Sequence, residues 1–297
     1  MVAYNEDAYE LQCLDWLAGV GWNLAKGPEI AHDGMMPERS SHKDILLVGR
    51  VEDAISRINP GTPKEVIRKV RQMLESPGET DVLKANQQIH QWMTEGISVK
   101  VRDESGEETT KLLWLIDFEN IENNDWLAVN QYSVQVDADA GTRRPDIVLF
   151  LNGIPISVLE LKNPSDLDTD IWQAFEQLQT YKAQISRLFY YNSVLMIADG
   201  ADARMGSLTA DQERFLKWRS VDGEVRDPHG TFGHTQTLIE GLYDKRHVLD
   251  MIQHFTVFIP GQKTIKMLPA YHQFFAVKKA YARALTASAD NGDGRGG

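Results

Sequence analysis

The stretch Arg143-Arg-Pro-Asp-Ile-Val-Leu-Phe-Leu-Asn-Gly-Ile-Pro-Ile-Ser-Val-Leu-Glu-Leu-Lys162 decides the fold. It predicts two apolar β-strands joined by a tight turn at Asn152-Gly153, because both residues tolerate the positive φ angles of a two-residue hairpin. The second strand is apolar on both faces almost to its end, which is typical of a strand in the middle of a sheet. We therefore predict that this hairpin lies at the centre of the fold.

Charged side chains end this second strand, and the turn predicts what faces them. Side chains alternate along a strand, so Glu160 is expected on the face opposite to Leu159. A simple two-residue turn pairs Leu151 with Ile154. Continuing that register places Asp146 opposite Leu159 and beside Glu160.

These charges suit metal-dependent hydrolysis of a phosphate ester. Two converging carboxylates, Asp146 and Glu160, are natural ligands for Mg²⁺, which prefers a few carboxylates and several waters. Lys162, beside such a metal, can position or deprotonate the attacking water and stabilise negative charge on a phosphodiester. The alternative is that Glu160 and Lys162 are solvated charges at a strand end, because so short a pattern has low specificity.

A helix expected from about Asp170 to Ser186 carries two further candidates. Gln177 and Tyr181 lie four residues apart and therefore share a helix face. An amide and a phenol that face the sheet could bind a DNA backbone or hold the catalytic loop. By themselves, however, they fit better a helix in which Tyr181 packs in the core and Gln177 is a polar surface residue.

Composition limits the class of protein. The chain has 297 residues, 42% hydrophobic and 25% charged, which is ordinary for a globular protein with a substantial core. A net charge of −12 argues against non-specific coating of nucleic acid but is compatible with an acidic metal site. We find no signal peptide or membrane-spanning run, and the single cysteine, Cys13, excludes an internal disulfide. We expect a cytoplasmic protein with no membrane partner.

The remaining pattern predicts an α/β domain: a mixed central β-sheet flanked by helices, with a helical insert over about residues 44–94. A strand, a helix and a strand follow Lys162, which predicts a parallel crossover unit. Helices are expected over residues 5–20, 44–58, from Pro63 after a Thr62 cap, 82–94, 237–242, 245–254 and 268–287. Strands are expected over residues 97–101, 112–116, 126–136, 189–198 and 255–259, with loops over 26–43 and 199–237 and a tail over 288–297 that cannot form core.

Several stretches resemble the N-terminal nuclease domain of the R subunit of type I restriction enzymes, which has a PD-(D/E)xK core. The resemblance extends from about Asn5 to Ala287 and is most specific between Ile116 and Lys162. The stretches that carry it are Ile116–Asn120, Asn123–Asp125, Val129–Gln131, Arg144–Pro155, Leu159–Pro164, Gln177–Tyr181, Tyr191-Asn192, Ala198–Gly200, Ala203–Ser207 and Phe215–Trp218.

The resemblance implies a role for each of the candidate residues. Asp146 and Glu160 would be the metal ligands and Lys162 the catalytic lysine of a Mg²⁺-dependent endonuclease that cuts double-stranded DNA. The Gln-x-x-x-Tyr pattern of Gln177 and Tyr181 matches the accessory motif of the family.

The first helix would supply a further glutamate to this site. Glu10 resembles the first-helix glutamate of such nucleases, although Glu6 competes for that place.

The end of the chain resembles the beginning of a helicase motor. In Tyr271–Val277, Gln273 resembles the glutamine that contacts adenine, although the same segment fits an amphipathic helix. No Gly-x-x-x-x-Gly-Lys-Ser/Thr loop is present, so ATP would be a cofactor of a longer protein only. We expect residues 1–255 to be the endonuclease domain, with its core at about 97–200, and residues 256–297 to lead into the motor.

The implied partners are DNA and the methylation and specificity subunits of a restriction complex. The alternative is a non-catalytic module that docks the motor onto those subunits, which the acidic balance and the helical insert favour.

Overall fold

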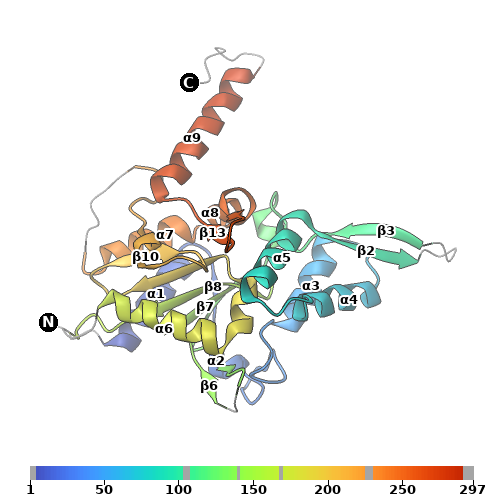
Figure 1. Cartoon of the computed structure of the whole chain (residues 1–297), viewed down its shortest axis with the longest axis horizontal. Helices are drawn as coiled ribbons and strands as arrows, with labels where there is room; N and C mark the ends of the chain where they lie inside the picture. The colour runs from blue at the N-terminus through green and yellow to red at the C-terminus, as the bar shows by residue number, and fades with distance from the viewer. Residues whose placement is uncertain (1–4, 103–107, 139–140, 167–169, 225–229, 290–297) are drawn as a thin grey trace.

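The computed structural model describes residues 5–102, 108–138, 141–166, 170–224 and 230–289. Within them a seven-stranded sheet follows the order β1-β4-β7-β8-β9-β10-β11, with helices on both faces (Figure 1). The pairs β1–β4 and β8–β9 are parallel and the others are antiparallel. The predicted α/β fold with a mixed central sheet is therefore confirmed. The strands of this sheet are β1 (Asn23–Lys26), β4 (Trp126–Asn130), β7 (Ile147–Leu151), β8 (Ile154–Leu161), β9 (Val194–Ala198), β10 (Ala203–Gly206) and β11 (Leu216–Lys217).

The hairpin β7–β8 occupies the centre of the sheet, as predicted, and every residue of both strands is buried. Its turn has φ values of 54° at Asn152 and 75° at Gly153. The Asn152 side chain also ties the turn to its surroundings, because it accepts the N–H of Asp125 and donates to the carbonyl of Leu115. These bonds explain why asparagine suits this position beyond its tolerance of positive φ.

The register of this hairpin differs from the prediction. Leu151 pairs with Ile154 and Phe150 with Pro155 as expected, but the pairs beyond them shift by one residue, so that Leu149 faces Ser157. Ile156 is the extra residue, which makes this a β-bulge on the second strand.

The bulge changes which residue faces Asp146. Beyond it, Ile147 pairs with Leu159, and continuing this register places Asp146 across from Glu160. The prediction that Asp146 lies opposite Leu159 is therefore wrong. Directly opposed residues of an antiparallel pair share a face, so the bulge brings the two carboxylates to the same face of the sheet.

Helices cover the sheet on both sides (Figure 1). Helices α1 (Glu6–Gly19) and α7 (Gly233–Leu242) pack together, with the Tyr9 hydroxyl 2.6 Å from Thr235, and α6 (Ile171–Gln184) lies on the other face. Helix α6 connects β8 to β9, which confirms the parallel crossover. Among the described helices, none combines the length and the apolar composition needed to cross a lipid bilayer.

The predicted helical insert is confirmed, with adjusted boundaries. It consists of α3 (Val48–Ile58), α4 (Lys64–Glu75) and α5 (Val82–Glu95), followed by a hairpin of β2 (Ile97–Arg102) and β3 (Glu108–Leu113). Helix α3 begins at Val48 and not at Asp44, because the Asp44 carboxylate accepts the N–H groups of Ser40 and Ser41 in the preceding turn. The N-cap of α4 is Pro63 and not Thr62.

Other boundaries differ where tertiary contacts decide them. The strand expected over 126–136 stops at Asn130 because Gln131 has a φ of 54°. The strand expected over 112–116 lies earlier in the chain, as β3 (Glu108–Leu113). The strand expected over 189–198 is shorter, as β9 (Val194–Ala198). The loops expected over 26–43 and 199–237 contain α2 (Gly27–Ile30), β10 and β11. The remaining elements are β5 (Val134–Gln135), β6 (Thr142–Arg143), β12 (Val257–Ile259), β13 (Ile265–Met267), α8 (Lys245–Asp250), four short helical turns (Ile121–Asn123, Ser186–Tyr191, Gln212–Arg214 and Met251–Phe255) and α9.

Helix α9 (Tyr271–Ser288) projects away from the sheet, as Figure 1 shows, although its first turn is anchored. Phe274 and Phe275 are buried, and both rings contact Trp218. The Gln273 side chain is exposed and accepts the N–H of Ala270 at the helix start. Residues 103–107, and residues 290–297 of the expected tail, lie outside the described residues.

Candidate active site

The end of the central hairpin brings three of the predicted residues together. Asp146 immediately precedes β7, and its Oδ2 accepts the backbone N–H of Leu161 at 2.6 Å. Across from it, Glu160 is 3% exposed near the end of β8. Lys162 follows, and its Nζ lies 3.1 Å from Glu160 Oε1. The strands thus hold two carboxylates and one ammonium group within a single cluster.

The electrostatics of this cluster favour protonated carboxyls. Burial raises the pKa of Glu160 well above its usual value, the charge of Asp146 raises it further, and Lys162 offsets part of the effect. Burial also raises the pKa of Asp146 to about 7, against the hydrogen bond from Leu161 and the charge of Lys162. A single lysine therefore does not compensate two neighbouring carboxylates, of which Glu160 is buried and Asp146 is half-buried.

Helix α1 adds a third carboxylate. Asn5 caps this helix, accepting the N–H of Ala8. Glu10 is buried and Glu6 is exposed, although both interact electrostatically with Asp146. Burial raises the pKa of the Glu10 carboxyl as well. Of the two glutamates, the structure places Glu10 inside the cluster.

Helix α6 presents Tyr181 to the same cluster. The Tyr181 hydroxyl donates a hydrogen bond to the carbonyl oxygen of Arg144 at 3.3 Å. It also hydrogen-bonds to the side chain of Gln177. Burial raises the pKa of Tyr181, and the charges of Glu160 and Asp146 raise it further. Tyr181 thus packs in the core and also faces the carboxylates, so the two roles considered for it are compatible. The phenol stays protonated and acts as a hydrogen-bond donor.

Two residues of the cluster were not among the predicted site residues. Asn130 ends β4 and donates to Glu10 Oε1 at 2.7 Å, and Gln131 approaches the same oxygen at 3.5 Å. The sequence signal that could have identified them is the pair of side-chain amides, Asn130 and Gln131, directly after the apolar residues of β4. Cys13 also lies near Asp146, but burial raises its pKa, so it remains a thiol and a poor metal ligand.

The donor set fits a hard divalent cation. Within the described residues, Glu160 Oε2 and Asn130 Oδ1 are buried oxygen atoms that have no hydrogen-bond partner. Buried polar atoms are normally paired, so an unpaired carboxylate oxygen beside a second carboxylate needs a further partner. Carboxylate and amide oxygens suit Mg²⁺ or Mn²⁺ better than softer metals. Gln273 belongs to a different part of the molecule and takes no part in this cluster.

Comparison with known proteins identifies the family of the chain. Residues 3–214 match the family described as Type I restriction enzyme R protein N terminus. The chain is 35% identical over 295 residues to the type I restriction enzyme HindI endonuclease subunit of Haemophilus influenzae. It is 32% identical over 298 residues to a protein of Methanocaldococcus jannaschii that is provisionally named as the type I restriction enzyme MjaIXP endonuclease subunit.

These alignments include 98% and 95% of the chain, but only 28% of the length of each relative. The chain therefore corresponds to about a quarter of those subunits. The match extends over most of the chain and includes α1, the central hairpin and α6, which carry the cluster. The chain belongs to the family of N-terminal regions of type I restriction enzyme R proteins.

Proposed function

We propose that this chain is the endonuclease module of a type I restriction enzyme and that it hydrolyses phosphodiester bonds of double-stranded DNA with Mg²⁺. One observation carries the proposal. The bulged hairpin places the half-buried carboxylate of Asp146 across from the buried carboxylate of Glu160, with Lys162 3.1 Å from Glu160 Oε1 and with Glu160 Oε2 unpaired among the described residues.

In this proposal Asp146 and Glu160 hold the cation. When bound, a divalent metal ion polarises the phosphate and lowers the pKa of a coordinated water. Neutralising the two carboxylates would also remove the cost of burying them ionised. The side chain of Leu161 takes no part, but its N–H orients the Asp146 carboxylate through a 2.6 Å hydrogen bond.

The other polar residues complete the site. Lys162 places a positive charge where an anionic phosphate oxygen would approach the carboxylates. Glu10, held by Asn130, adds a third oxygen ligand or orients a water. Tyr181 and Gln177 form a hydrogen-bonded pair that would hold the Arg144 segment and, with it, the DNA backbone.

The complete enzyme would use this module together with parts outside the chain. We infer that residues 1–255 form the nuclease unit and that residues 256–297 lead toward a motor. Gln273 would contact the adenine of ATP there, and translocation would bring DNA to the site. Methylation and specificity subunits would supply sequence recognition.

The proposal is tested in the assembled enzyme. Asp146→Asn, Glu160→Gln and Lys162→Ala are each expected to lower the rate of DNA cleavage by at least about a hundredfold. ATP hydrolysis should persist, since it reports correct assembly. Glu176→Gln on the exposed side of α6 serves as the control and should cleave normally. Undiminished cleavage by the first three variants would overturn the proposal and favour a non-catalytic docking module.

A further inference from the structure

The β8 bulge determines whether the carboxylate pair exists at all. If Ile156 were paired instead of bulged, the hairpin would keep the pairing that its turn begins, and Asp146 would lie opposite Leu159. A shift of one residue moves a side chain to the other face of a strand, so Asp146 and Glu160 would then lie on opposite faces. Whatever stabilises the bulge therefore also positions the two carboxylates.

Two kinds of hydrogen bond anchor the bulge to the neighbouring strand. The carbonyl oxygen of Ile156 accepts the N–H of Ser193 at 2.6 Å. The next residue, Ser157, donates its hydroxyl proton to the carbonyl of Val194, the first residue of β9, at 2.8 Å. The second bond comes from a side chain, so the sequence can gain or lose it by a single substitution.

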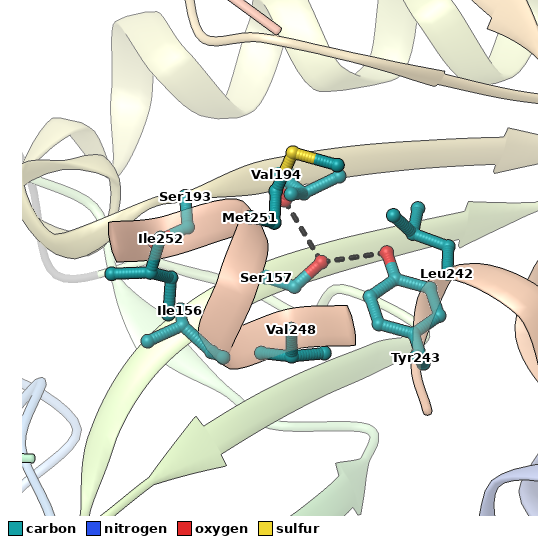
Figure 2. Close-up of a pocket in the computed structure, with 9 residues that line it drawn as sticks. All are labelled: Ile156, Ser157, Ser193, Val194, Leu242, Tyr243, Val248, Met251 and Ile252. Atoms are coloured by element: carbon teal, nitrogen blue, oxygen red, sulfur yellow. Dashed lines mark hydrogen bonds between the residues drawn. The ribbon is translucent and has the colours of Figure 1, made fainter. Parts of the chain in front are cut away.

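A tyrosine completes the arrangement from outside the sheet. Tyr243, at the end of α7, places its hydroxyl 2.8 Å from Ser157 Oγ, and Figure 2 shows this contact together with the bond to Val194. The serine hydroxyl has one proton, which it gives to the Val194 carbonyl, so the tyrosine must be the donor in the second bond. Burial raises the pKa of Tyr243, which keeps that proton in place.

The tyrosine is itself held rigidly. Tyr243 is 1% exposed, and its carbonyl accepts the indole N–H of Trp22 at 2.8 Å. Ser157 and Tyr243 also line a cavity of only about 10 Å³. Such a space is at the lower limit for a single water. The two hydroxyls therefore depend on each other, since little room exists for a replacement partner.

We propose that Ser157 and Tyr243 are positioning residues for the carboxylate pair, because their hydrogen bonds fix the bulge that places Asp146 opposite Glu160. The inference rests on the proposed function of that pair. Ser157 precedes Glu160 by three residues, which is roughly 10 Å along a strand, so it does not touch the metal or the substrate. Its effect would be transmitted through the register of β8.

The test measures the affinity of the 297-residue chain for Mn²⁺ by titration calorimetry. Ser157→Ala is expected to weaken Mn²⁺ binding about tenfold, in the range seen when outer partners of metal ligands are removed. Tyr243→Phe, which keeps the packed ring, should weaken it in the same direction by a smaller factor. Because both substitutions break the same bond, the double variant should be no weaker than Ser157→Ala.

Ser207→Ala is the matched control, because Ser207 is also buried and donates its hydroxyl to a backbone carbonyl, that of Lys266, at 2.6 Å. Ser207→Ala should lose about as much stability in urea as Ser157→Ala does, but it should bind Mn²⁺ as the wild type does. If Ser157→Ala binds Mn²⁺ as well as Ser207→Ala does, or if the two substitutions add in full, the inference is overturned.

The outcome for the proposed function remains separate. Glu160→Gln should abolish Mn²⁺ binding, whereas the wild-type chain should bind it. Should the wild-type chain bind no Mn²⁺, or Glu160→Gln bind it unchanged, the proposed function itself fails and the positioning role fails with it. Normal binding by the wild-type chain, together with normal binding by Ser157→Ala and Tyr243→Phe, overturns the positioning role alone.

Discussion

Replacing Asp146 by asparagine should stabilise the protein when no divalent cation is bound. Burial raises the pKa of Asp146 to about 7, so the folded state binds this proton more tightly than the unfolded state does. Ionisation of this carboxyl therefore lowers the free energy of unfolding. The loss is complete above about pH 7, becomes smaller as the pH falls, and vanishes below about pH 4. Asparagine carries no charge, and its Oδ1 can still accept the N–H of Leu161.

The size of the effect follows from the shift in pKa. A rise from 3.8 to about 7 corresponds to about 4 kcal/mol for ionising an isolated group. Asp146 titrates together with Glu160 and keeps some contact with solvent, and the substitution also removes its attraction to Lys162. The net gain should therefore be about 1–3 kcal/mol, which for a chain of this size raises Tm by roughly 3–8 °C.

Divalent metal should reverse the order of stability. At a concentration of about 1,000 times Kd, a ligand that binds only the folded state contributes about 4.1 kcal/mol. The wild-type chain would gain this amount, whereas Asp146→Asn lacks one ligand and would gain much less. Thermal unfolding at about pH 8, followed in EDTA and then in excess MgCl₂, should give Tm differences of opposite sign.

Asp117 provides a matched control, because its pKa is shifted in the opposite direction to that of Asp146. The pKa of Asp117 is lowered, because hydrogen bonds from Asn120, Asn123 and Glu119 outweigh the effect of burial. Asp117→Asn should therefore lose stability at about pH 8 and show a normal response to Mg²⁺. The reasoning is refuted if Asp146→Asn melts below the wild type in EDTA. Equal stabilisation of the wild type and of Asp146→Asn by Mg²⁺ would show that Asp146 is not a ligand.

Two further predictions concern stability away from the site. Full burial lowers the pKa of Lys266 to about 7, so the folded state binds its proton less tightly than the unfolded state. In urea unfolding, the stability of the wild type relative to Lys266→Met should rise by about 2 kcal/mol between about pH 7 and pH 9, because the ionisation of Asp146 and Glu160 is common to both proteins. A difference that stays constant over this range would contradict this cause. Gly153→Ala should cost about 1–3 kcal/mol in the same assay, because its Cβ would lie 2.6 Å from the Leu47 carbonyl oxygen at a φ of 75°. Unchanged stability would mean that the turn relaxes.

Local pattern was sufficient for the parts of the fold that are encoded locally. The Asn152-Gly153 turn and the apolar residues around it predicted the central hairpin, and the residues after Lys162 predicted a parallel crossover. Helical periodicity predicted the insert and α1. The short strands β10 and β11 were not predicted, because strands of four and two residues carry too little pattern and form only by pairing with the sheet.

The candidate site depended on information that a simple hairpin rule lacks. Residue types and the family resemblance together selected Asp146 and Glu160, but the rule paired Asp146 with Leu159. The correct pairing requires a bulge at Ile156, and the local mark of it is Pro155, which has no N–H to donate and in a central strand is typical of a bulge. The bulge is held by contacts with β9 and with Tyr243, 86 residues from Ser157 in the sequence. The chemistry of the site was thus predictable from its residues, whereas its geometry depends on distant packing, which is where substitutions far from the carboxylates should alter metal binding.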